Sequence, residues 1–131
     1  MEPSREQLFS EYDTTVVIAN DPQRGWVDPG PVAFATRRSA VVMTAWNPGH
    51  ERPTVERNRT MNEAMGRELR ATGFEVWRAD GRAPDGSWLE EGWIIWDMPV
   101  DQGLDIASMY RQYAIYRYDE TGRRSTLACP S

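Results

Sequence analysis

The feature that most constrains the fold is the order in which strand-like and helix-like segments alternate between residues 40 and 118. Apolar and β-branched runs indicate strands, whereas apolar residues that recur every three or four positions indicate helices. On these patterns we expect a strand, a helix, two strands, a helix and a strand, at residues 40–46, 54–71, 74–79, 92–98, 99–112 and 114–118. This order predicts an α+β fold with a ferredoxin-like split βαβ core (βαββαβ) and a mainly antiparallel sheet carrying two helices.

The flanks of this core are expected to widen the sheet within a single domain. Residues 1–39 are interpreted as an N-terminal extension that begins with a short helix or arm over residues 1–12. Residues 20–31 are rich in Pro, Gly and Asp and predict a loop. Residues 119–131 predict a C-terminal hairpin. The strands expected within these flanks lie at residues 14–19, 32–36 and 125–128.

The composition narrows the class of protein. Of the 131 residues 40% are hydrophobic, which suffices for a folded core, and no apolar run is long enough to span a membrane. The N-terminus lacks an apolar leader and Cys129 is the single cysteine, so a cytoplasmic protein without an intrachain disulfide is expected. The net charge of −5 argues against direct nucleic-acid binding. All 15 cationic side chains are arginines, and the absence of lysine excludes Schiff-base chemistry and a P-loop.

Two asparagines occupy positions of the helix at 54–71 that should be apolar. At about 100° per residue, Asn58 and Asn62 fall on the same face as Met65 and Leu69 and therefore point inward. A buried amide without partners costs about 1–3 kcal/mol, so these side chains must be met by other groups. Either they bind the backbone of the loop at 47–53, or they contact a polar ligand such as a nucleotide, base or sugar together with Asn47.

A pair of glutamates follows Trp88 and a Pro-Asp-Gly turn. If Glu90 or Glu91 points inward against Trp88, its raised pKa would suit it to act as a general acid or base; the alternative is a solvated entry to the strand. His50 is the single histidine, which is too few for a multi-histidine metal site. No nucleophile motif or glycine-rich phosphate loop is present, so neither a metal nor a cofactor is expected.

Aromatic residues recur on the expected strands, among them Trp46, Trp77 and Tyr116. An open sheet face of this kind would stack unpaired bases, whereas a covered face would pack beneath the N-terminal extension. The negative net charge and the apolar residues of the extension favour the covered face.

The segment from Thr44 to Gln112 carries a distinctive series of residues. It opens with Thr-Ala-Trp-Asn-Pro at residues 44–48 and continues through Asn58, Asn62, Gly73, Gly81, Pro84, Gly86, Trp88, Glu90 and Glu91. On these residues the chain resembles a bacterial family known only as domain of unknown function 3293. Two positions depart from the family pattern, because Gly49-His50 and Gly92 stand where the family tends to have serine. The resemblance implies a small cytoplasmic bacterial protein and supplies no activity; if those serines carry chemistry, this chain would bind without reacting.

These observations favour a non-catalytic binding or regulatory domain with a polar cleft for a nucleotide- or sugar-like ligand. The residues expected to line the cleft are Thr44, Trp46, Asn47, Asn58, Asn62, Trp88 and Gln112. One alternative is an enzyme acting on a nucleotide or glycosidic substrate, with Glu90 or Glu91 as general base. The other is an acidic protein-interaction module or inhibitor that presents carboxylates from residues 1–31 and competes for a partner's nucleic-acid site.

Overall fold

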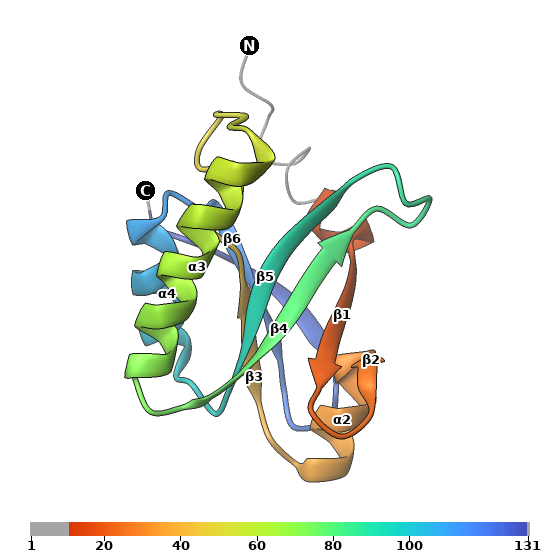
Figure 1. Cartoon of the computed structure of the whole chain (residues 1–131). Coiled ribbons are helices and arrows are strands. Elements are labelled where there is room, and N and C mark those ends of the chain that lie inside the picture. The colour runs from red at the N-terminus through yellow and green to blue at the C-terminus, as the bar shows by residue number, and fades with distance from the viewer. Residues whose placement is uncertain (1–10, 131) are drawn as a thin grey trace.

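The strands of this protein form one antiparallel sheet with helices on both faces. The computed structural model describes residues 11–130, and within them the sheet has seven strands in the order β2-β1-β4-β5-β3-β6-β7 (Figure 1). The strands are β1 (Val16–Asp21), β2 (Gly25–Val27), β3 (Ala40–Met43), β4 (Glu75–Arg82), β5 (Leu89–Trp96), β6 (Ala114–Tyr118) and β7 (Arg124–Ala128). The helices are α2 (Pro29–Thr36), α3 (Val55–Ala71) and α4 (Val100–Met109), and residues 11–14 are also helical. The predicted α+β class is confirmed.

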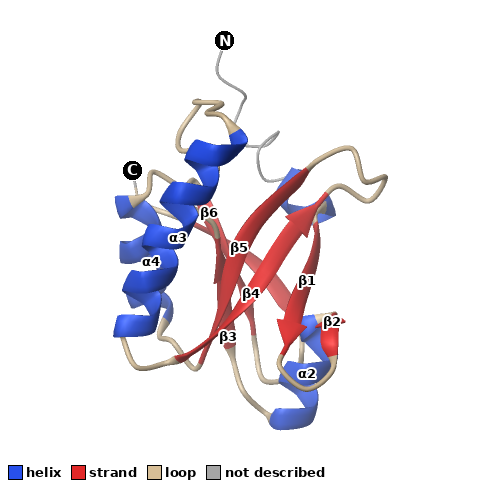
Figure 2. Ribbon diagram, in the orientation of Figure 1, coloured by secondary structure: helices blue, strands red, loops and turns tan. Residues whose placement is uncertain are grey.

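The two faces of the sheet bury different halves of the core. Helices α3 and α4 lie side by side on one face (Figure 2), where they cover Val41 and Trp93. Since successive residues of a strand point to opposite faces, Val42 and Ile94 point the other way. That second face is covered by α2 near one end of β1 and by residues 11–14 near the other, with Tyr12 packed against it. The predicted covering of the aromatic face is thus provided, in the described part of the chain, by these two elements.

Helix α3 forms where the 3.6-residue pattern predicts it. The Thr54 side chain caps its first turn by accepting a hydrogen bond from the Arg57 backbone N–H at 3.2 Å. Gly73, with φ of 87°, follows the last turn, in a conformation that glycine adopts without strain. Within the helix, Gly66 faces Trp93 so closely that a Cβ there would overlap the indole ring. This close approach seats α3 directly on β5.

The strand predicted at residues 32–36 is wrong, because this segment belongs to helix α2. Asp28 caps the helix by accepting from the Gly30 N–H at 2.9 Å, and Pro29 follows as its first residue. Arg37, with φ of 54°, ends it. Local capping therefore outweighs the strand preference of Val32. The loop predicted at residues 20–31 is also interrupted, since β2 pairs there with β1.

Several predicted boundaries shift for identifiable reasons. The strand expected at 40–46 ends at Met43, because the Ala45 N–H bonds the side chain of Asn62 instead of a neighbouring strand. The hairpin of β4 and β5 is longer than predicted and pairs Arg82 with Leu89. Asp80, which follows the strand expected at residues 74–79, therefore lies within β4. The second helix ends at Met109 rather than near residue 112.

Two expectations reach beyond the described part of the chain. The helix or arm at residues 1–12 and the acidic surface at 1–31 both include residues 1–10, which lie outside the described residues. Within residues 11–130, no helix combines the length and apolar character needed to cross a bilayer.

Candidate functional site

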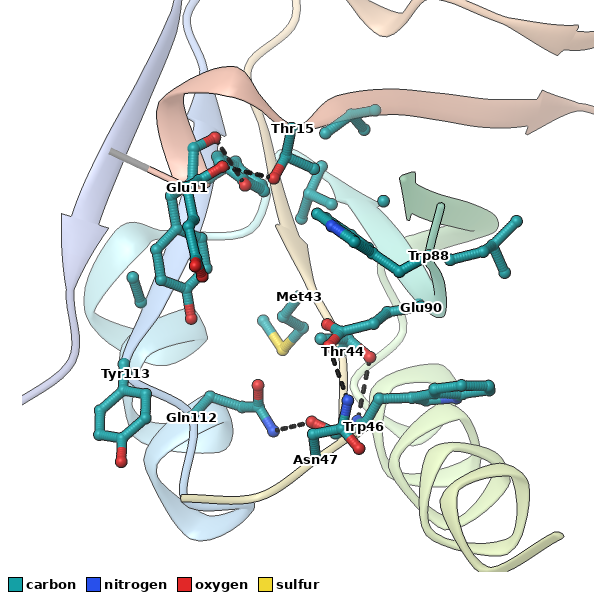
Figure 3. Close-up of a pocket in the computed structure, with 18 of the residues that line it drawn as sticks. Glu11, Thr15, Met43, Thr44, Trp46, Asn47, Trp88, Glu90, Gln112 and Tyr113 are labelled. Atoms are coloured by element: carbon teal, nitrogen blue, oxygen red, sulfur yellow. Dashed lines mark hydrogen bonds between the residues drawn. The ribbon is translucent and has the colours of Figure 1, made fainter. Parts of the chain in front are cut away.

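A pocket of about 490 Å³ lies on the sheet face opposite α3 and α4 (Figure 3). Its walls come from residues 11–15, the loop after β3, the tip of the β4–β5 hairpin and the start of β6. The floor is built of small residues, because Ala79, Gly81 and Gly92 occupy the central strands there. A Cβ at position 92 would lie 2.6 Å from the carbonyl oxygen of Met43, so glycine is required at this point. The hollow exists because neighbouring strands present almost no side chain to it.

The loop that forms one wall is held by the amides of α3. Oδ1 of Asn62 accepts from the Ala45 N–H at 3.2 Å, and Oδ1 of Asn58 accepts from the Asn47 N–H at 3.0 Å. Nδ2 of Asn58 also donates to Oδ1 of Asn47 at 3.1 Å. Asn58 and Asn62 are 3% and 1% exposed, so the predicted inward orientation is confirmed. Neither lines the pocket; they brace the loop, which is the first of the two alternatives drawn from the sequence.

Asn47 links this braced loop to a carboxylate in the pocket. Its backbone has φ of 49°, a left-handed conformation that asparagine tolerates better than most residues. Its Nδ2 donates to Oε1 of Glu90 at 2.9 Å. Burial raises the pKa of Glu90, and the charge of Glu11 adds to the rise, while the Asn47 hydrogen bond and the positive charge of Arg52 oppose it. Glu90 is thus a fixed and poorly solvated carboxyl group that faces the pocket.

Glu91 lies on the opposite face of β5, where its carboxylate forms ion pairs with two arginines. One of its carboxylate oxygens is 3.0 Å from Nε of Arg59, and the other is 3.5 Å from a terminal nitrogen of Arg78. The guanidinium of Arg78 also stacks over Trp93 at 4.9 Å from the ring centroid. The structure therefore separates the two candidate glutamates, with Glu90 in the pocket and Glu91 in an ion-pair cluster beneath α3.

The other predicted lining residues are brought together around Glu90. The hydroxyl of Thr44 donates to the Glu91 carbonyl at 2.6 Å and accepts from the Trp46 N–H at 3.0 Å. Both hydrogen bonds are to backbone groups, so this hydroxyl stabilises the loop. Trp88 is 42% exposed and stands beside Glu90 at the edge of the pocket (Figure 3). Trp46 is buried and contributes to the wall.

Gln112 contributes an acceptor to the pocket. Its Nε2 donates to the carbonyl oxygens of Trp46 at 3.1 Å and Tyr110 at 3.3 Å. With the nitrogen occupied, Oε1 is turned away from Trp46 and toward the cavity (Figure 3). The predicted residues Thr44, Trp46, Asn47, Trp88, Glu90 and Gln112 therefore share one pocket, while Asn58 and Asn62 stand behind it.

Part of the pocket lining is not predicted from the sequence. Tyr12, Tyr116, Arg52 and Arg111 also border the pocket. The Tyr116 hydroxyl donates to the Tyr12 carbonyl at 2.8 Å, and burial raises the pKa of Tyr116 to about 12. Because side chains alternate along β6, Tyr116 lies on the same sheet face as Tyr118, and this alternation could have predicted the face on which Tyr116 lies. Nothing in the sequence pattern connects residues 12 and 116, which lie far apart in the chain.

The described residues provide no ready metal site. Within residues 11–130, no group of three His, Cys, Asp or Glu side chains is placed to hold a metal ion. His50 instead shares a hydrogen bond of 2.8 Å with the hydroxyl of Tyr113. The arrangement can bind a polar molecule, orient it and exchange a proton with it through Glu90.

Comparison with known proteins yields one family. The family model described as "Protein of unknown function (DUF3293)" matches residues 43–115. This range includes the braced loop, α3, the β4–β5 hairpin and Gln112, and so most of the pocket wall. No curated protein matches the chain significantly, and no solved structure does.

Proposed function

The chain belongs to the DUF3293 family of proteins of unknown function, and we propose that it is a small-molecule binding domain with a regulatory role. Its ligand would be nucleotide- or sugar-like and would occupy the pocket around Glu90. We also infer that the domain is cytoplasmic. The four central strands in the order β4-β5-β3-β6, joined through α3 and α4, support a ferredoxin-like core around which the other strands are added.

The observation that carries this proposal is the Glu90 carboxyl, fixed at 2.9 Å by Asn47 inside the pocket. Burying a carboxyl group costs free energy unless it is hydrogen-bonded, and a partly buried carboxyl in a pocket is typical of a functional site; the braced loop holds its hydrogen-bond partner in place. The pocket volume of about 490 Å³ is in the range that small-molecule sites occupy. Polar side chains converge there on a hollow whose lining is more apolar than polar, as in a site that selects its ligand by hydrogen bonding.

A second candidate function is catalysis with Glu90 as general base. The raised pKa of Glu90 favours it, because a base works best when its pKa lies close to the working pH. Binding remains the better-supported function, since the one hydrogen bond that residues 11–130 make to the Glu90 carboxyl comes from the amide of Asn47, which has no proton to exchange in catalysis.

A thermal-shift screen tests the binding function directly. Nucleotides and sugar phosphates are added at millimolar concentration to the wild-type protein and to Glu90→Gln. A ligand present at 100 times its Kd stabilises the folded state by about 2.7 kcal/mol, which is readily measured. We expect at least one compound class to raise the Tm of the wild type and to raise that of the variant less. The absence of any shift across both classes would contradict the proposal.

Catalysis is tested with the same pair of proteins. Any compound found to bind is incubated with the wild type and followed by mass spectrometry and NMR. Unchanged ligand supports a binding domain. Turnover that is lost in Glu90→Gln would instead establish the enzyme alternative.

A further inference from the structure

We propose that the ligand is a nucleoside monophosphate of the guanine type, with its base directed into the pocket and its phosphate at the mouth. This inference rests on the binding function proposed above and specifies the ligand class for the same pocket. It follows from the way in which hydrogen-bond acceptors and cations are distributed around the cavity.

Two side chains of the inner wall, Glu90 and Gln112, keep an acceptor oxygen that no hydrogen bond from residues 11–130 occupies. Glu90 uses Oε1 to accept from Asn47, and no hydrogen bond from residues 11–130 engages its second oxygen. The side-chain nitrogen of Gln112 donates to two backbone carbonyls, so the side-chain oxygen is available to accept a hydrogen bond from a ligand in the cavity. Thr44 has no donor left, because its hydroxyl proton goes to the carbonyl of Glu91. A ligand that binds these two oxygens must present N–H groups to them.

The floor and one side of the cavity suit a flat ring. Gly81 and Gly92 leave bare backbone on the floor, and Trp88 stands at the edge with much of its indole exposed. Base–aromatic stacking contributes about 1–3 kcal/mol and tolerates any flat heterocycle. Stacking therefore selects a base over a sugar, while the acceptors select which base.

Guanine presents two adjacent donors, its ring N1–H and its exocyclic amino group. A carboxylate accepts both at once in a bidentate arrangement, and Oε1 of Glu90 has a second lone pair for this beside its bond from Asn47. Hypoxanthine retains only the ring N–H, and adenine places a lone pair at the corresponding ring nitrogen. Burying a lone pair against a carboxylate costs more than losing a single hydrogen bond. The expected order of affinity is therefore GMP, then IMP, then AMP.

The mouth of the pocket carries the cations. Arg52 and Arg111 both line it and are both exposed, and Arg52 donates to the backbone carbonyl of Glu51 at 2.9 Å. Arg111 reaches the Glu51 carboxylate at 3.5 Å and packs over Gly49. Guanidinium groups suit phosphate because their planar forks bind it in a bidentate manner. Glu90 would repel a phosphate placed beside it, so charge favours the orientation with the base inward.

Titration calorimetry with five compounds tests this inference: GMP, IMP, AMP, guanosine and ribose 5-phosphate. We expect GMP to bind at least tenfold more tightly than IMP, and AMP and ribose 5-phosphate to bind more weakly still. Glu90→Gln should weaken GMP binding at least tenfold. Glu91→Gln is the matched control, since it alters the neighbouring glutamate on the opposite face of β5 and should bind GMP like the wild type.

The phosphate assignment is tested by an Arg52→Ala, Arg111→Ala double variant. It should weaken GMP binding at least tenfold and leave the weaker binding of guanosine within a factor of two. Equal binding of GMP and AMP, or an undiminished affinity in Glu90→Gln, would overturn the inference. Binding of ribose 5-phosphate alone would overturn it while leaving the proposed binding function intact. A failure of all five compounds together with a negative thermal-shift screen would remove both.

Discussion

Replacing Asn58 with alanine tests whether the amides of α3 hold the pocket loop in place. The side chain makes two hydrogen bonds with Asn47, at 3.0 Å to its backbone N–H and at 3.1 Å to its side-chain oxygen. Both are lost in Asn58→Ala. The remaining contact between Asn62 and Ala45 still holds the start of the loop, so we expect local loosening and a lower stability rather than a failure to fold.

The magnitude follows from these two bonds. Each hydrogen bond contributes about 0.5–1.5 kcal/mol, and a polar group left buried without a partner costs about 1–3 kcal/mol. Alanine recovers about 0.5 kcal/mol through its higher helix propensity. The free energy of unfolding should therefore fall by about 2–3 kcal/mol. With an unfolding entropy of about 2.1 cal/mol/K per residue, the Tm of this chain of 131 residues should fall by about 7–11 °C.

Urea unfolding followed by tryptophan fluorescence measures this change. Thr60→Ala is the matched control, because Thr60 is exposed on the same helix and its hydroxyl bonds only the Glu56 carbonyl of the preceding turn. The control should stay within about 0.5 kcal/mol of the wild type. If Asn58→Ala were no less stable than Thr60→Ala, the bracing role of the amide would be refuted.

Burial raises the pKa of Glu90, so its proton is bound more tightly in the folded state, and the stability this provides is lost as pH rises through the raised pKa. Glu90→Gln cannot ionise, so its Tm relative to that of the wild type should rise between pH 4 and pH 8 when both are followed by thermal unfolding. A difference in Tm that does not change with pH would contradict a raised pKa of Glu90. Gly66→Ala should lower stability by about 1–3 kcal/mol because the added Cβ overlaps Trp93, and an unchanged Tm would show that α3 is not seated so closely. Asp28→Ala should cost about 1 kcal/mol in urea unfolding by removing the cap of α2, whereas Asp28→Asn should retain most of it.

Periodicity predicted the long elements well because they bury one face. The inward orientation of Asn58 and Asn62 followed from helical geometry alone, and the structure confirms it. Their partners were beyond that reasoning, since the loop at residues 44–47 reaches α3 only through the tertiary arrangement of β3. Helix α2 escaped prediction for a different reason: it is short and apolar, and its cap at Asp28 decides its conformation against the β-branched side chain of Val32.

The sequence predicted which residues gather at the candidate site better than it predicted what each of them does there. Strand alternation requires Glu90 and Glu91 to face opposite ways, but it does not say which face is hollow. That depends on the small residues Ala79, Gly81 and Gly92 lying together across two strands, which only the pairing of β4 with β5 reveals. The contribution of Tyr12 likewise depends on the N-terminal segment folding back over β6.

The most direct measurement of the central claim is the pKa of Glu90, read from the pH dependence of its carboxyl carbon shift by NMR in wild type and in Asn47→Ala. The arrangement predicts a pKa above the usual glutamate value of about 4.3 in the wild type and a further rise in the variant, because the Asn47 hydrogen bond favours the charged form. A pKa at or below the usual value, unchanged by the loss of Asn47, would contradict the claim that this carboxyl is held in a poorly solvated pocket.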